Sequence, residues 1–188
     1  MNYLEILGTA VGLVYLWLEY RAHIYLWIAG VVMPAIYIFV YYDAGLYADF
    51  GINIYYLLAA IYGWTAWKHQ RKSADESSPE RPITRMALQC YLPLAAVFLV
   101  TFVVIAWVLI RFTDSTVPWL DSFTTALSMV AMWMLARKYV EQWLAWIAVD
   151  GVCCGLYFYK ELPFTATLYG LYAVIALLGY YKWKRMMA

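Results

Sequence analysis

Seven apolar stretches divide this chain of 188 residues, and each approaches the length that a helix needs to cross a lipid bilayer. Crossing about 30 Å of hydrocarbon takes roughly 20 helical residues. Hydrophobic residues make up 66% of the chain, more than a soluble domain of this size can bury. We therefore expect an all-α integral membrane protein with seven transmembrane helices, at Tyr3–Leu18, Ile24–Tyr42, Tyr47–Trp67, Ala87–Ile110, Pro118–Ala136, Val140–Phe158 and Phe164–Trp183.

Basic residues gather in the connections on one side of the expected membrane. They follow the first, third, fifth and seventh stretches, whereas the other connections carry mainly acidic residues. Because cytoplasmic connections are enriched in Lys and Arg, the N-terminus is expected outside and the C-terminus in the cytoplasm. The polar segment 68–86 is then a flexible cytoplasmic loop.

The residues that catalysis or metal binding requires do not cluster in this sequence. Its three cysteines lie in apolar segments, and its two histidines are far apart. Neither a P-loop nor a nucleophile–base pair is visible. We therefore expect no enzyme, no metal site, no cofactor and no nucleic-acid partner.

The chain repeats itself at an offset of 116 residues. The segment Thr9–Lys68 aligns without gaps to the segment 125–184, with 14 identities in 60 residues. The identities include Trp17/Trp133, Arg21/Arg137, Trp27/Trp143, Tyr56/Tyr172, Gly63/Gly179 and Trp67/Trp183.

The repeat unit is three helices, and the fourth helix joins the two copies. Because one extra helix restores the orientation, the copies are parallel, in a 3+1+3 arrangement. The expected parts are a first three-helix bundle (1–67), the cytoplasmic loop (68–86), a linker helix with an outer loop (87–117) and a second bundle with a cytoplasmic tail (118–188). Parallel repeats are typical of transporters whose substrate site lies between the halves. A membrane receptor or enzyme is the remaining alternative.

Asp150 is an acid near the middle of the sixth stretch. A charge there costs roughly 2.5–3.5 kcal/mol on insertion scales, so a cationic or polar ligand is a reason to keep it. Trp146 lies one turn earlier and Tyr157 two turns later, on the same face. An acid beside an indole suits a flat organic cation. The alternative is a hydrogen bond from Asp150 to a neighbouring helix. Its counterpart in the repeat is Pro34, so the acid is specific to one half.

Asn53 in the third stretch is the second candidate for substrate binding. Its amide can both donate and accept hydrogen bonds. Tyr56 and Trp64 share its face and are further candidates, as is Trp143 in the sixth stretch. Asn53 could instead join two helices, and the aromatic residues could instead pack in the core.

The chain resembles the PnuC family of bacterial vitamin transporters over nearly its whole length. The resemblance is carried by Asp121-Ser-Phe through Met129-Val-Ala, by 137–146 (RKYVEQWLAW), and by Leu46-Tyr-Ala with Ile61-Tyr-Gly-Trp64 and Trp67. It implies a full-length version of the SWEET fold. It also implies facilitated diffusion across the inner membrane, homotrimers, and retention of substrate by a separate cytoplasmic kinase.

The resemblance also bears on substrate. Family members that carry nicotinamide riboside have Trp-x-x-x-Asn in the sixth helix and Gln in the third. Here these positions are Trp146, Asp150 and Asn53. Because Asp cannot donate to a carboxamide oxygen, the sequence favours thiamine, as in the PnuT subgroup that the chain also resembles. Nicotinamide riboside stays the alternative.

Overall fold

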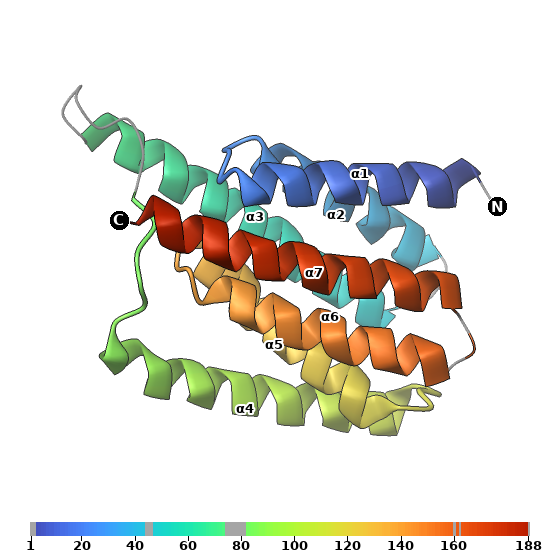
Figure 1. Ribbon diagram of the computed structural model, residues 1–188. Coiled ribbons are helices and arrows are strands. Elements are labelled where there is room, and N and C mark those ends of the chain that lie inside the picture. Colours follow the sequence, from blue (N-terminus) through green and yellow to red (C-terminus); the bar gives the residue numbers. More distant parts are fainter. Residues whose placement is uncertain (1–2, 44–46, 74–81, 160, 162, 188) are drawn as a thin grey trace. The chain divides into compact units, whose positions relative to one another are not determined.

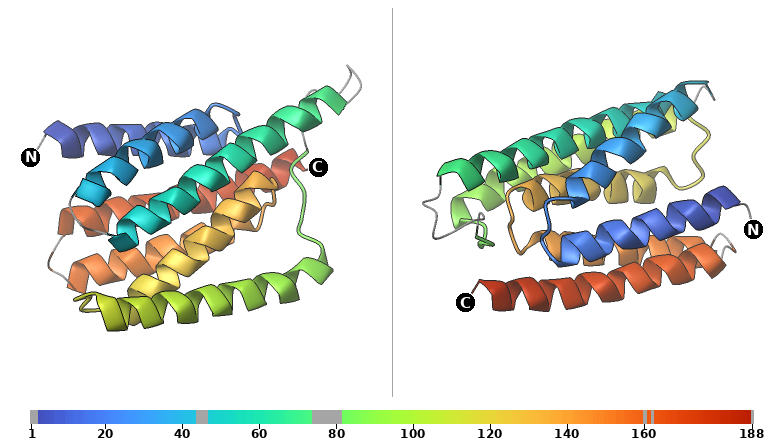
Figure 2. Two further views of the ribbon diagram at one scale, coloured as in Figure 1. Left: turned by 180° about the vertical axis from the view of Figure 1, so that it is seen from behind. Right: turned by 90° about the horizontal axis from the view of Figure 1, so that it is seen from above.

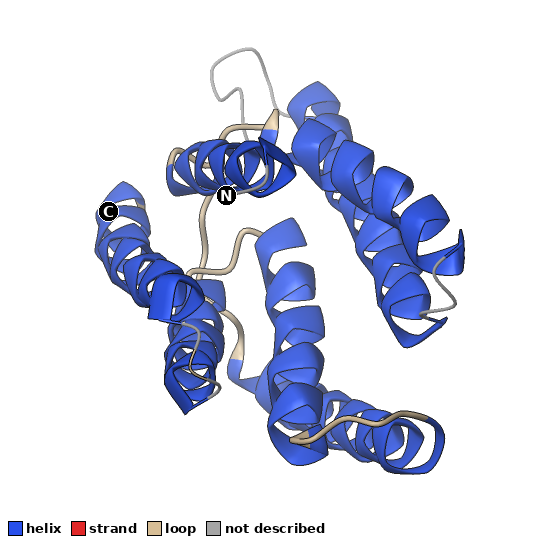
Figure 3. Cartoon of the chain, turned by 90° about the vertical axis from the view of Figure 1, so that its right-hand side faces the viewer, coloured by secondary structure: helices blue, strands red, loops and turns tan. Residues whose placement is uncertain are grey.

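The computed structural model describes residues 3–43, 47–73, 82–159, 161 and 163–187, and these form helices joined by short loops (Figures 1 and 3). The helices are α1 (Tyr3–Tyr20), α2 (Leu26–Asp43), α3 (Tyr47–Ser73), α4 (Leu88–Phe112), α5 (Pro118–Ala136), α6 (Gln142–Tyr159) and α7 (Pro163–Met186). Each predicted stretch corresponds to one of these helices. The bounds predicted for α5 are those observed.

The polar segment after the third stretch is partly helical. Helix α3 continues to Ser73, so the prediction of a loop that begins at residue 68 is wrong for its first part. Lys, Arg and Gln are good helix formers, and a helix can continue into water once its apolar part ends. Residues 74–81 of the predicted loop lie outside the described residues.

The chain forms two compact units, residues 1–82 with α1–α3 and residues 83–188 with α4–α7. In the first unit α2 packs along α3, and α1 contacts α2. In the second unit α6 packs along α7, and α5 contacts both α4 and α6 (Figure 2). Helix α4, predicted as a linker between the repeats, thus packs within the second unit.

The repeat is visible in a buried Trp–Gly contact inside each unit. In the second unit the Trp143 ring is fully buried against Gly179 of α7 and meets Trp183 edge to face, with ring centroids 5.6 Å apart at 89°. The equivalent residues of the first unit repeat this contact, with centroids 5.4 Å apart at 90°. These residues are Trp27, Gly63 and Trp67.

The turn before the second helix of each repeat also has the same backbone shape. Ala22 and Lys138, at the 116-residue offset, both adopt the left-handed conformation, with φ of 53° and 55°. The preceding arginine of each turn lies over a tryptophan ring one turn back, 4.5 and 5.5 Å from its centroid. The pairs are Arg21 with Trp17 and Arg137 with Trp133. The identities found in sequence therefore mark conserved contacts within the two copies.

A strap of residues 83–86 is hydrogen-bonded to the turn between α5 and α6. The Thr84 N–H donates to the Lys138 carbonyl oxygen at 3.1 Å, and the Val140 N–H donates to the Thr84 carbonyl oxygen at 3.0 Å. The Met86 N–H donates to Glu141 Oε2 at 3.0 Å. The strap thus fixes the chain entering α4 against the start of α6.

By length and composition, two of the described helices could cross a membrane, namely Leu88–Phe112 and Pro163–Met186. Many large apolar side chains of α4 are exposed, among them Leu92 at 81% and Trp107 at 57%. Such a surface suits contact with hydrocarbon better than contact with water.

Candidate functional site

Asp150 lies on the buried side of α6, with 7% of its surface exposed. Its carboxylate interacts electrostatically with Tyr169 and Tyr172 of the neighbouring α7. Within the described part of the chain no basic side chain neutralises it. A buried carboxylate without a cation of its own is suited to a ligand that brings positive charge or hydrogen-bond donors.

Three tyrosines form an aromatic cluster where α6 meets α7, and two of them, Tyr169 and Tyr172, interact electrostatically with Asp150. Tyr157 and Tyr169 are stacked, with ring centroids 5.2 Å apart at 10°. Tyr169 meets Tyr172 edge to face, with centroids 5.8 Å apart at 73°. The cluster therefore offers both ring surfaces and hydroxyl groups next to the acid.

Tyr169 and Tyr172 were not among the residues that the sequence singled out for substrate binding. The repeat could have indicated these two residues, because Tyr172 is the counterpart of Tyr56 and Tyr169 is the counterpart of Asn53. Two candidates on α3 thus correspond to the two α7 residues that the structure brings to Asp150.

Trp146 lies one helical turn before Asp150 and is partly buried. Its ring packs against an apolar cluster at the interface of α5, α6 and the strap, formed by Met86, Val130, Ala131, Met134 and Ala145. The indole Nε1 is buried without a hydrogen-bond partner among the described residues. Trp146 therefore has a supported ring and an N–H group that can still donate.

The structure gives Trp143 a packing role. It is 0% exposed and fills the space above Gly179. Its counterpart Trp27 packs against Gly63 in the same way, so the contact belongs to the scaffold of both repeats and we leave Trp143 out of the proposed site.

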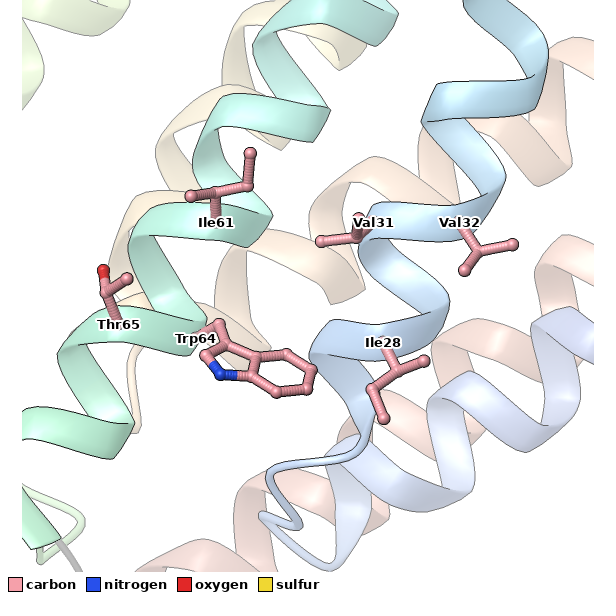
Figure 4. A pocket seen from close by; sticks show the side chains of 6 residues that line it. All are labelled: Ile28, Val31, Val32, Ile61, Trp64 and Thr65. Carbon is pink, nitrogen blue, oxygen red and sulfur yellow. The ribbon is translucent and has the colours of Figure 1, made fainter.

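The remaining candidates lie on α3 in the first unit. Asn53 is half-buried, and Tyr56, one turn later, interacts electrostatically with Tyr15 of α1. Trp64 lines an open apolar groove of about 380 Å³ between α2 and α3 (Figure 4). The groove is lined by Ile28, Val31, Val32, Ile61, Trp64 and Thr65. It has no charged side chain, so the Trp64 ring is the lining group that could interact with a cation there.

In the second unit Asp150 interacts with Tyr169 and Tyr172, and Tyr157 stacks on Tyr169, whereas Trp146 lies one turn along α6 and packs against the cluster of α5 and the strap. This arrangement combines one carboxylate, several hydroxyl groups and flat aromatic surfaces. It suits a small ring-bearing molecule with hydrogen-bond donors or a positive charge. Among the described residues no group of His, Cys, Asp and Glu could hold a metal ion.

The model of one protein family, described as nicotinamide mononucleotide transporter, matches residues 2–185. The chain belongs to this family. Family membership makes it a membrane transporter of small molecules, as its repeat predicted, and it is not an enzyme.

Relatives within the nicotinamide mononucleotide transporter family differ in the substrates that their names state. The chain is 23% identical to the nicotinamide riboside transporter PnuC of Escherichia coli (strain K12) over 204 residues, covering 97% of this chain and 85% of that protein. It is 28% identical to the riboflavin/roseoflavin transporter RibM of Streptomyces davaonensis over 185 residues, covering 95% of this chain and 83% of that protein.

A crystal structure of the vitamin B3 transporter PnuC has the same fold. Its TM-score is 0.69 at 22% sequence identity, covering 95% of this chain and 79% of that chain. The expected seven-helix, all-α transporter fold is therefore confirmed. The expected assignment to the PnuC family is confirmed as well, whereas these relatives give no support to the thiamine subgroup.

Proposed function

We propose that this protein carries a vitamin with a nitrogen-containing aromatic ring across the bacterial inner membrane, and that nicotinamide riboside is its first candidate substrate. The observation that carries this proposal is the buried Asp150 carboxylate, which interacts electrostatically with Tyr169 and Tyr172. A carboxylate can pair with the ring cation of nicotinamide riboside or accept a hydrogen bond from its carboxamide.

The tyrosines supply the hydrogen-bond donor for a carboxamide oxygen that Asp150 cannot provide. The sequence favoured thiamine because Asp150 cannot donate to a carboxamide oxygen. In the structure the hydroxyl-bearing Tyr169 and Tyr172 lie beside that carboxylate, and a hydroxyl can donate. The names of relatives such as the E. coli transporter also favour nicotinamide riboside.

Thiamine stays the second candidate, supported by Asp150 itself. Its thiazolium cation and its aminopyrimidine both suit an acceptor that carries full negative charge. Riboflavin, named for the Streptomyces relative, has no cationic ring and gains less from the acid.

In this proposal Asp150 pairs with the charged or amino part of the substrate, and Trp146 provides a stacking surface. Tyr157, Tyr169 and Tyr172 line the same place. We also propose Asn53 of the first unit as a substrate-binding residue. We also propose facilitated diffusion with later trapping by a cytoplasmic kinase, a homotrimeric assembly, and an N-terminus outside with a cytoplasmic C-terminus.

The test compares nicotinamide riboside, thiamine and riboflavin as ligands of the purified protein by isothermal titration calorimetry. We expect nicotinamide riboside to bind most tightly, and we expect uptake of it into liposomes. Tight binding of thiamine alone establishes the second candidate and rejects the first. Failure of all three to bind or enter liposomes rejects the proposed function.

The role of Asp150 is tested by Asp150→Ala, with Gly155→Ala on the exposed side of the same helix as the control. Removing the carboxylate should weaken binding by more than about tenfold, the factor that one charge-assisted hydrogen bond is worth. Gly155 has no atom within 4 Å of an added Cβ, so the control should bind like the wild type. Wild-type affinity in Asp150→Ala rules out the assigned role.

A further inference from the structure

Gln142, the first residue of α6, is fully buried at 0% exposure. Both Nε2 and Oε1 of its side chain are buried without a hydrogen-bond partner among the described residues. Burying an amide without partners is unfavourable, since the hydrogen bonds it made to water in the unfolded chain are lost. The side chain therefore weakens the fold at this position unless something else bonds to it.

The repeat shows that the scaffold does not require an amide here. The counterpart of Gln142 at the 116-residue offset is Leu26, which is also 0% exposed and is also the first residue of its helix. Each of these two residues precedes the tryptophan that packs against the buried glycine of its unit, Trp143 against Gly179 and Trp27 against Gly63. An apolar side chain of similar size thus satisfies the same packing position in the other copy.

Gln142 also lies on the helix face that carries the proposed site. Residues 142, 146 and 150 are spaced by four, so Gln142, Trp146 and Asp150 form one stripe along α6. Gln142 and Asp150 are about 12 Å apart along the axis, given a rise of about 1.5 Å per residue. Between them, the Nε1 of Trp146 is a second buried donor without a partner among the described residues.

We propose that Gln142 is a second polar station on the substrate path, two helical turns from Asp150. The amide is covered in the described conformation, so it exchanges hydrogen bonds with a hydroxyl, carbonyl or amino group of the substrate in a conformation that exposes the start of α6 during transport. In the proposed orientation this station lies on the cytoplasmic side, where it lowers the barrier to release. This inference rests on the proposed function and adds a transport role for a residue outside the binding site.

Substituting a residue on the transport path changes the rate of transport, whereas substituting a residue of the main site changes the equilibrium affinity for substrate. Loss of Gln142 should slow transport while the equilibrium affinity at Asp150 stays the same. The test variants are Gln142→Leu, which installs the residue of the other repeat, and Gln142→Met, which keeps an unbranched side chain of similar length. Leu26→Met at the matched position of the first unit is the control.

We expect both Gln142 variants to melt at or above the wild-type temperature, because a buried amide without a partner is removed. The dissociation constant of nicotinamide riboside should change less than about twofold, while its uptake rate into liposomes falls by about fivefold, the factor of one ordinary hydrogen bond. Gln142→Asn, which retains a shorter amide, should keep an intermediate rate. The Leu26→Met control should transport at the wild-type rate.

Wild-type uptake by Gln142→Leu and Gln142→Met overturns the proposal. So does a lower melting temperature accompanied by slower uptake, because Gln142 would then support the fold. A loss of affinity as large as the loss of rate places Gln142 in the main site and also overturns it. Absence of uptake by the wild type, measured in the same liposomes, rejects the proposed function and this inference together.

Discussion

Replacing Gly179 by alanine tests whether the buried Trp–Gly contact holds α6 against α7. A Cβ at position 179 would lie 2.7 Å from Cζ2 and Cη2 of Trp143. Carbon atoms in contact prefer separations of about 3.5–4.0 Å, so the indole or the helix must move by about 0.8 Å. Trp143 is 0% exposed, and Trp183 meets it edge to face, so the ring has little room to move.

Such overpacking typically costs about 1–3 kcal/mol. The gain in helix propensity from glycine to alanine offsets up to about 1 kcal/mol of this cost. We therefore expect Gly179→Ala to be destabilised by up to about 2 kcal/mol, the part of the overpacking cost that remains once helix propensity offsets about 1 kcal/mol. Gly63→Ala should be affected more, because its Cβ would lie 2.3 Å from the Trp27 ring.

The assay is thermal unfolding of the detergent-solubilised protein, followed by differential scanning fluorimetry. The control is Gly155→Ala, where an added Cβ meets no atom within 4 Å and helix propensity alone should act. The smaller ring of Trp143→Phe should relieve the overlap in the double variant with Gly179→Ala. If Gly179→Ala is as stable as Gly155→Ala, the reasoning about the contact is refuted.

Three further variants test the strap and the candidate site. Glu141→Ala removes the acceptor of the Met86 N–H, so hydrogen exchange at that amide should accelerate, and unchanged protection would contradict the observed bond. Asp150→Asn removes charge but keeps an acceptor, so it should weaken binding of a cationic vitamin less than Asp150→Ala does; equal losses would show that charge alone matters. Asn53→Ala should weaken the binding measured by calorimetry by about fivefold if its amide bonds substrate, and wild-type affinity would remove Asn53 from the site.

The sequence was sufficient for the number of helices and for the repeat. Both follow from local properties: a helix that crosses hydrocarbon must satisfy its own backbone, so its length and apolar composition appear directly in the chain. The 14 identities correctly marked equivalent contacts, because a tryptophan that fills a glycine notch constrains both residues in each copy.

Composition alone did not predict where α3 ends. Polar residues after an apolar stretch indicate the membrane boundary, but they do not end a helix when they are themselves good helix formers. The same limit applies to residues 83–86, where the chain is held by hydrogen bonds to the turn before α6. A local sequence pattern does not predict a hydrogen-bond partner that is more than fifty residues away in the chain.

For the candidate site, helical periodicity in the sequence was enough to predict that an acid and a tryptophan share one face of the sixth helix. The surroundings of these two residues came from the tertiary structure. It placed Tyr169 and Tyr172 beside Asp150, packed Trp143 away against Gly179, and left the Gln142 amide buried without a described partner. The physical reason is that helical periodicity fixes neighbours within one helix, whereas the pairing of faces between helices depends on how side chains of distant segments fill space together.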